Sequence, residues 1–162
     1  MGRVIANAAI AMWDKTEPVV VDKLTCSMEI VYNKTRTEGE ERYEEMKELI
    51  VAEQPDMVIT HWPIDSHRDH RVCAVLVYDA WRQTGYSFDL YYGEVMTGLQ
   101  TQNFSPTLWV DISETHARKL KAYHCHQSQG IDEVQAYHDH MEILRGMECH
   151  ARYGEAFIKQ NY

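Results

Sequence analysis

The segment that most constrains the fold of this chain is Asp56-Met57-Val58-Ile59-Thr60-His61. It is a short apolar run rich in β-branched residues, which is typical of a strand buried on both faces of a parallel sheet. We predict a helix on each side of it, over residues 40–53 and 71–83, because apolar residues recur there at helical spacing. The side chains expected to face the core are Tyr43, Met46, Leu49 and Ile50 in the first helix and Val72, Val75, Leu76 and Ala80 in the second.

The rest of the chain continues this alternation of strands and helices. We predict a helix over residues 4–12, strands over 18–21, 90–96 and 107–112, and helices over 114–123, with Ser113 as N-cap, and over 131–149. Residues 25–37 fit either a strand or an irregular loop, and Tyr91, Tyr92 and Trp109 are expected in the core. This order predicts an α/β fold with a mostly parallel sheet flanked by helices. A length of 162 residues suits a single domain over 1–162.

Composition argues against several classes of protein. The formal net charge of −9 disfavours nucleic acid as a partner, because an acidic domain repels phosphate backbones. No apolar run approaches the ~20 residues of a membrane helix, and the first residues show no signal-peptide pattern. The four cysteines form no CxxC pair, which argues against a thiolate zinc site. We therefore expect a cytoplasmic protein.

Histidine and aspartate gather directly after the central strand, in Asp65-Ser66-His67-Arg68-Asp69-His70. Functional sites in open α/β sheets form at the carboxyl ends of strands. His67 and His70 lie three residues apart at the expected start of a helix, so both can point into one cleft. Asp69 is placed to accept a ring N–H from one of them and to fix its tautomer. A solvated loop with an N-cap is the alternative interpretation, and His61 fits packing and cleft lining equally well.

The other histidines give weaker signals. His124 and His126 flank Cys125, and His138-Asp139-His140 lies on the last predicted helix, where positions i and i+2 diverge and form no natural chelate. We expect His138, His140 and His150 on the solvated surface.

Three ordered signatures resemble the LmbE-like (PIG-L) zinc N-deacetylases. The first is the strand that opens with Pro55-Asp56 and runs into the D-x-H-x-D-H loop of residues 65–70. The second is the K…H-x-S-Q element that ends in His126-Gln127-Ser128-Gln129, and the third is the segment Gly154-Glu155-Ala156-Phe157. The match covers most of the chain from Glu40 onward.

The resemblance implies a Rossmann-like fold and an enzyme that uses zinc to remove acetyl groups from N-acetylated sugars or related amides. It places His70 at a zinc-ligand position, His67 where the oxyanion of the tetrahedral intermediate is stabilised, and Asp69 in support. His61, Asp65, His126 and Gln129 are candidate residues lining the site. A zinc ion with three protein ligands keeps a position for water, lowers the pKa of that water and polarises the amide carbonyl.

One part of the family pattern is missing from the sequence. No A-H-P-D-D-E motif and no His-x-x-Asp precedes residue 60, and that motif carries the family's general base and two of its three zinc ligands. We therefore expect a domain that lacks the first two strands of the family fold, binds zinc weakly or not at all, and forms a homo-oligomer through an open strand edge.

Two other functions compete with deacetylation. The chain could be a catalytically inactive α/β module that binds a ligand or oligomerises, which the missing motif favours. It could also be a histidine–aspartate phosphohydrolase that uses His138-Asp139, but that function requires further His and Asp ligands on facing helices.

Overall fold

The computed structural model describes residues 40–125 and 130–161, and the following statements concern those residues. The elements are α3 (Glu40–Glu53), β1 (Met57–His61), α4 (Arg68–Gln83), β2 (Asp89–Gly93), β3 (Leu108–Asp111), α5 (His116–Tyr123), α6 (Ile131–Glu148) and β4 (Gly154–Lys159). The elements predicted over residues 4–12 and 18–21, the segment 25–37, and the candidate site residues His126 and Gln129 lie outside this part of the chain.

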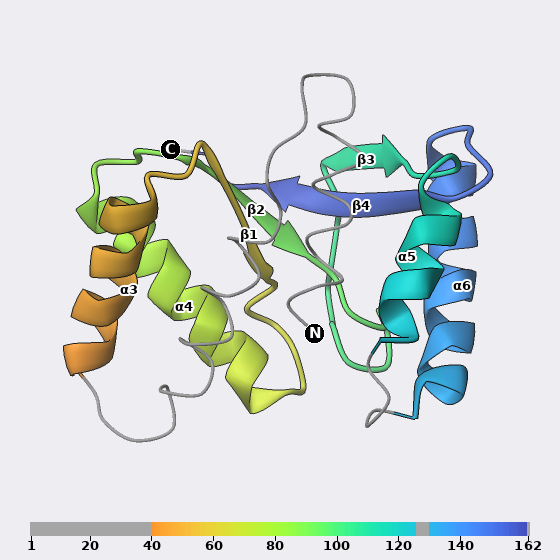
Figure 1. The fold of residues 1–162 in the computed structure, drawn as a ribbon, viewed down its shortest axis with the longest axis horizontal. Helices are drawn as coiled ribbons and strands as arrows, with labels where there is room; N and C mark the ends of the chain where they lie inside the picture. Colours follow the sequence, from red (N-terminus) through yellow and green to blue (C-terminus); the bar gives the residue numbers. More distant parts are fainter. Residues whose placement is uncertain (1–39, 126–129, 162) are drawn as a thin grey trace.

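The strands form one sheet in the order β1-β2-β4-β3 (Figure 1). β1 pairs with β2 in parallel, and β4 is antiparallel to both β2 and β3. The α/β class is confirmed, but the described sheet is mixed where a mostly parallel one was predicted. The reason is the helix pair between β3 and β4, because α5 and α6 carry the chain away and back again. β4 therefore starts where β3 ends, with Gly154 opposite Asp111, and runs in the reverse direction.

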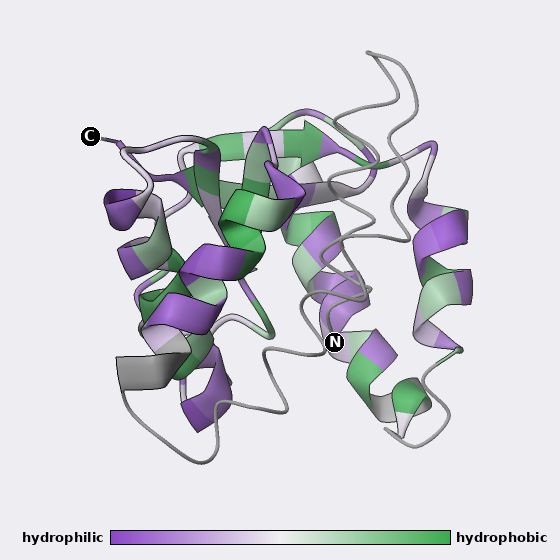
Figure 2. Cartoon of the chain, turned by 60° about the vertical axis from the view of Figure 1, so that its left-hand side comes forward, coloured by the Kyte–Doolittle hydropathy of each residue, from purple (hydrophilic) through white to green (hydrophobic). Residues whose placement is uncertain are grey.

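Helices α3 and α4 pack together beside β1 and β2, while α5 and α6 lie at the β3–β4 end of the sheet (Figure 1). The larger core fills the space between the first pair of helices and the first two strands, and its fully buried members include Met46, Val77, Trp81 and Leu90. A smaller cluster joins residues of all four strands and includes Ile59, Tyr91, Val110 and Phe157. Hydrophobic and hydrophilic residues alternate along the helices in Figure 2, as expected for amphipathic elements.

Helix α4 begins at Arg68, three residues before its predicted start. Its buried face consists of His70, Cys73, Ala74, Leu76, Val77, Ala80 and Trp81. Val75 was predicted to face inward but is 45% exposed, because it lies two residues from both Cys73 and Val77 and therefore on the other side of the helix.

Two further predictions in the second half of the chain are corrected. Ser113 does not cap α5, which begins at His116; the Ser113 hydroxyl accepts a hydrogen bond from the backbone N–H of Tyr153 instead. Trp109 is partly exposed rather than in the core, and its indole N–H donates to Glu148. Tyr91 and Tyr92 are buried as predicted.

Among the described residues, no helix has the length and apolar character required to cross a membrane.

Candidate functional site

The predicted cluster lies at the carboxyl end of β1. His61 is the last residue of β1, Asp65 lies in the following loop, and His67 is the N-cap of α4. β1, β2 and β3 all run in the same direction, so their carboxyl ends lie at the same end of the sheet. A bridge between Asp65 and Thr101 ties the loop after β1 to the loop after β2. The fold therefore brings two loops, distant in sequence, to one place.

Asp65 is the centre of the cluster. Its side chain is fully buried and accepts hydrogen bonds from the backbone N–H of His67 at 2.7 Å and from the Thr101 hydroxyl at 3.0 Å. Its second oxygen also lies 3.2 Å from Nδ1 of His70. Burial alone would raise the pKa of Asp65, but these hydrogen bonds outweigh burial and hold the pKa below its ordinary value. Asp65 is therefore ionised.

The carboxylate beside Nδ1 of His70 is thus that of Asp65, whereas Asp69 was predicted for this supporting position. Asp69 directly precedes His70 in the first turn of α4, and adjacent helical residues do not face each other. Asp65 reaches the imidazole from the loop, which folds back over the start of the helix. The role expected of Asp69 is better filled by Asp65.

His70 is fully buried, and burial lowers the pKa of its imidazole, so the ring is neutral at pH 7. A neutral ring that donates from Nδ1 to the Asp65 carboxylate carries its lone pair on Nε2. The side-chain amide of Gln100 lies 3.0 Å from the same Nδ1 and packs against that edge of the ring. This arrangement is that of a metal-binding imidazole, or of a general base held by a carboxylate.

His61 packs face to face on His70, with ring centroids 3.8 Å apart and planes 2° from parallel. Burial, and secondarily the charge of a protonated His70, lowers the pKa of His61 to about 3. Its Nδ1 is buried without a hydrogen-bond partner among the described residues. Lone pairs in two parallel ring planes cannot converge on one ion, so His61 lines the site as a neutral ring and does not chelate together with His70.

His67 is exposed and lies beside His70, with ring centroids 4.6 Å apart. Its Nδ1 accepts a hydrogen bond from the backbone N–H of Asp69 at 3.3 Å, the N-cap interaction of α4. The neutral ring therefore carries its proton on Nε2. A solvent-facing N–H beside a buried lone pair suits a group that donates to a developing oxyanion.

The residues around His70 fit one ligand position of a zinc site but do not complete the set. Burial keeps His70 neutral, and Asp65, itself engaged by three hydrogen-bonding groups, orients the ring, so His70 is the ligand candidate of this cluster. In the described ranges, this cluster offers no second group that converges with His70 on one ion. The two other ligands that the resemblance implies come from a motif that the sequence lacks before residue 60.

Sequence reasoning missed Gln100 and Thr101. Both are buried polar residues in the loop after β2, at least 30 positions from the histidine cluster. Neither is a typical catalytic residue, and only the strand order brings them to Asp65 and His70. Buried polar groups are costly unless they are hydrogen-bonded, so the burial of Gln100 and Thr101 indicates that they support His70 and Asp65.

His138 was expected on the surface but is buried against Tyr123, at a centroid distance of 5.1 Å. The cause is the position of α5, which covers this face of α6. Burial, and secondarily the charge of Lys119, lowers the pKa of His138 to about 4. His140 and His150 are exposed as predicted.

His61 and His138, two of the buried neutral histidines, predict a stability that falls in mild acid. The unfolded chain takes up protons at His61 and His138 near pH 6.5, whereas the folded chain resists them until the pH reaches about 3 and about 4. The free energy of unfolding is therefore greatest above pH 6.5 and decreases as the pH falls toward 4. Each histidine contributes up to about 1.4 kcal/mol per pH unit in that window.

Urea unfolding measured at several pH values tests this dependence. The variant His138→Gln should show a shallower slope than the parent chain, because one of the two groups is removed. A free energy of unfolding that stays constant between pH 7 and pH 5 would contradict the assignment of both rings as neutral.

Comparison with known proteins supports the resemblance. The family model of PIG-L, described as GlcNAc-PI de-N-acetylase, matches residues 12–81, a span that includes β1, the 65–70 loop and most of α4. The resemblance predicted from the motifs to the PIG-L (LmbE-like) family is thereby confirmed. No curated protein matches the chain by sequence.

Several solved structures share the fold. A conserved protein from Thermus thermophilus is 15% identical, with a TM-score of 0.68, over 97% of this chain and 88% of that one. N,N'-diacetylchitobiose deacetylase from Pyrococcus horikoshii is 16% identical, with a TM-score of 0.68, over 97% and 78%. GalB, the 4-carboxy-2-hydroxymuconate hydratase from Pseudomonas putida, is 13% identical, with a TM-score of 0.66, over 97% and 90%. At these identities the likeness concerns the fold alone.

Proposed function

We propose that this chain is a hydrolase that removes the acetyl group from an N-acetylated sugar or a related amide. The observation that carries the proposal is the buried, neutral His70, which Asp65 orients at the carboxyl ends of the strands, where sites of α/β folds form. The family match and the deacetylase among the similar folds support a deacetylase-type or hydrolase-type function.

The residues act in distinct ways in this proposal. Asp65 is a positioning residue, because it fixes the tautomer of His70 and keeps the lone pair on Nε2. His67 donates from Nε2–H to the oxyanion that forms when water adds to the amide carbonyl. Asp69 holds the His67 ring through its backbone N–H. We keep His61 as a lining ring, and His126 and Gln129 as lining residues proposed from the resemblance.

Zinc is the metal we propose for His70. When bound, it would polarise the amide carbonyl and lower the pKa of a coordinated water. Because His70 is the one ligand that this cluster supplies in the described ranges, the proposed zinc binding is weak. We also propose a cytoplasmic location, which rests on the sequence pattern.

An inactive binding module is the second candidate, and the incomplete ligand set around His70 favours it. The purified chain, supplied with zinc, should be incubated with N-acetylglucosamine and N,N'-diacetylchitobiose while free primary amine is measured. The proposal expects amine release that depends on the chain. Binding of these sugars without amine release would support the module, and neither binding nor release would refute both.

We further propose that the chain forms a homo-oligomer. β1 is an outer strand of the described sheet, and a strand edge that no other described strand covers favours association. Sedimentation velocity at several protein concentrations should show a species at least twice the 19.0 kDa mass of the chain. A well-folded monomer at every concentration would contradict this prediction.

A further inference from the structure

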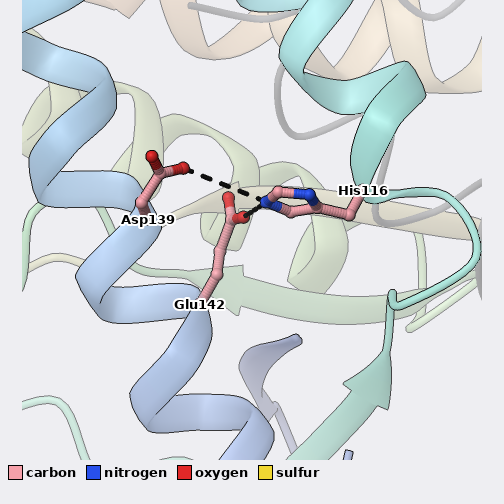
Figure 3. A group of neighbouring side chains, drawn as sticks. All are labelled: His116, Asp139 and Glu142. Atoms are coloured by element: carbon pink, nitrogen blue, oxygen red, sulfur yellow. Dashed lines mark ion pairs between the residues drawn. The ribbon is translucent and has the colours of Figure 1, made fainter. Parts of the chain in front are cut away.

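A second cluster of metal-ligating side chains lies between α5 and α6, and the proposed hydrolysis does not use it. It consists of His116, the first residue of α5, and of Asp139 and Glu142 on α6 (Figure 3). Asp139 and Glu142 are three positions apart, so they share the face of α6 that looks toward α5. We propose that these three side chains form a binding site for a divalent transition metal, with Zn²⁺ as the best match.

The three candidate ligand atoms face one another. Nε2 of His116 lies 3.0 Å from Oε2 of Glu142 and 3.9 Å from Oδ1 of Asp139, and all three lie within 4.8 Å of one another. Two carboxylate oxygens and one imidazole nitrogen at such spacings surround a volume the size of one ion. Zinc takes ligands of both types at about 2.0–2.2 Å.

None of the three atoms has a hydrogen-bond partner among the described residues. Nε2 of His116, Oδ1 of Asp139 and Oε2 of Glu142 are also each buried. The Glu142 side chain is 99% buried, its relative exposure being 1%. Buried polar atoms without hydrogen bonds are costly, so three of them directed at one point are the second observation that indicates a ligand.

The neighbouring groups hold the ligands in place without filling the site. The other oxygen of Glu142, Oε1, lies 2.6 Å from Nζ of Lys119 and accepts a hydrogen bond from the Tyr123 hydroxyl at 3.3 Å. Oε2 is therefore directed toward His116. The His116 ring stacks on Tyr153, with centroids 3.6 Å apart and planes 3° from parallel, which fixes the direction of Nε2.

Charge also favours a cation. Lys119 lies between Glu142 and Glu155, so one ammonium serves two carboxylates, and Asp139 adds a third. Burial raises the pKa of Glu155, but even without Glu155 the carboxylates of Asp139 and Glu142 outnumber the one ammonium, and this excess of negative charge attracts a cation. Two carboxylates with one imidazole select zinc or manganese over the softer metals that prefer thiolates. The side chain of Asp139 is 36% exposed, which gives an ion a route from solvent.

Zinc titration by calorimetry of the whole chain, after removal of metal by a chelator, tests the site. We expect stoichiometric binding by the parent chain and by His70→Ala, which separates this site from the cluster at β1. The variant Asp139→Asn should bind zinc at least tenfold more weakly, and His116→Gln should lose the site. The matched control is His140→Gln, an exposed histidine beside Asp139 on α6, which should bind like the parent chain.

Thermal melting gives a second reading that does not depend on enzyme activity. Zinc should raise the Tm of the parent chain and of His70→Ala, because a ligand that binds only the folded state stabilises it. Zinc should not raise the Tm of Asp139→Asn. This variant is expected to fold, because the side chain of Asp139 is partly exposed. Absence of stoichiometric binding to the parent chain, or binding unchanged in Asp139→Asn, would overturn the proposal and leave an ion pair between His116 and the carboxylates. Failure of the deacetylase assay would not affect either measurement.

Discussion

Replacement of His70 by alanine is expected to lower kcat/KM for the release of acetate by at least about a hundredfold, the effect typical of removing a positioned acid–base group. His70 is the buried imidazole that Asp65 orients in the proposed site, and no other histidine of this cluster in the described ranges has such a carboxylate partner. Initial rates with N,N'-diacetylchitobiose measure the effect, and far-UV circular dichroism checks that the variant folds.

Two further variants separate chemistry from folding. Asp65→Asn keeps the shape of the side chain but removes the charge that fixes His70, so we expect a tenfold to hundredfold loss of activity and a changed pH profile. His140→Ala, on the exposed face of α6, should retain full activity. Full activity in a folded His70→Ala protein would show that the reaction occurs elsewhere in the chain.

Replacement of Gly154 by alanine is expected to cost about 3 kcal/mol of stability, the upper range for forcing extra atoms into a packed interior. A Cβ at this position would lie 2.7 Å from the carbonyl carbon of Arg145 and 2.7 Å from the backbone nitrogen of Gly146. Both atoms belong to the backbone of α6, which cannot move aside as a flexible side chain could. The start of β4 and the end of α6 would therefore separate, and Tm should fall by roughly 10 °C.

Gly93→Ala is the matched control for this prediction. Gly93 is also in a buried strand, but a Cβ there would meet the Phe157 ring at 3.6 Å and the Ile59 side chain at 3.9 Å, both ordinary contacts. We expect its free energy of unfolding to change by less than about 1 kcal/mol, within the range of well-tolerated changes. Urea denaturation of both variants measures the difference, and equal stabilities would contradict the close approach of the two backbones.

Much of the fold was predictable because its signals are local. The amphipathic pattern of residues 40–53 and the β-branched run before His61 gave α3 and β1 almost to the residue. The antiparallel course of β4 depends instead on how α5 and α6 return the chain, which no local pattern encodes. Trp109 was predicted in the core because it is a large aromatic residue. Its partial exposure depends instead on the tertiary position of Glu148, to which its indole N–H donates.

The candidate site was predictable in part for the same reason. His61, Asp65, His67 and His70 lie within ten residues, so their meeting needs only a strand, a loop and a helix start. Asp69 was predicted as the partner of His70 from its proximity in sequence, but helical geometry turns Asp69 away, and Asp65 reaches the ring from the preceding loop. Gln100 and Thr101 could not be found, since the pairing of β1 with β2 brings them in.

The cluster of His116, Asp139 and Glu142 shows the same limit more strongly. The pair His138-Asp139 attracted attention in the sequence because the two residues are adjacent, but α6 buries His138 against Tyr123 and turns Asp139 toward His116. The facing histidine that a metal site on this helix requires comes from α5, more than 20 residues earlier. Sequence spacing could name the right carboxylate but could not find its partners.

The central claim, hydrolysis of an N-acetyl amide, is tested most directly by turnover in heavy-oxygen water. N,N'-diacetylchitobiose would be incubated with the zinc-supplied chain, and acetate and free amine would be measured by mass spectrometry. The account predicts that each acetate released contains one heavy oxygen atom from water and is matched by one free amine. A substrate that gains water while it retains its acetyl groups, as expected of a hydratase, or that remains unchanged with folded protein, would contradict the account.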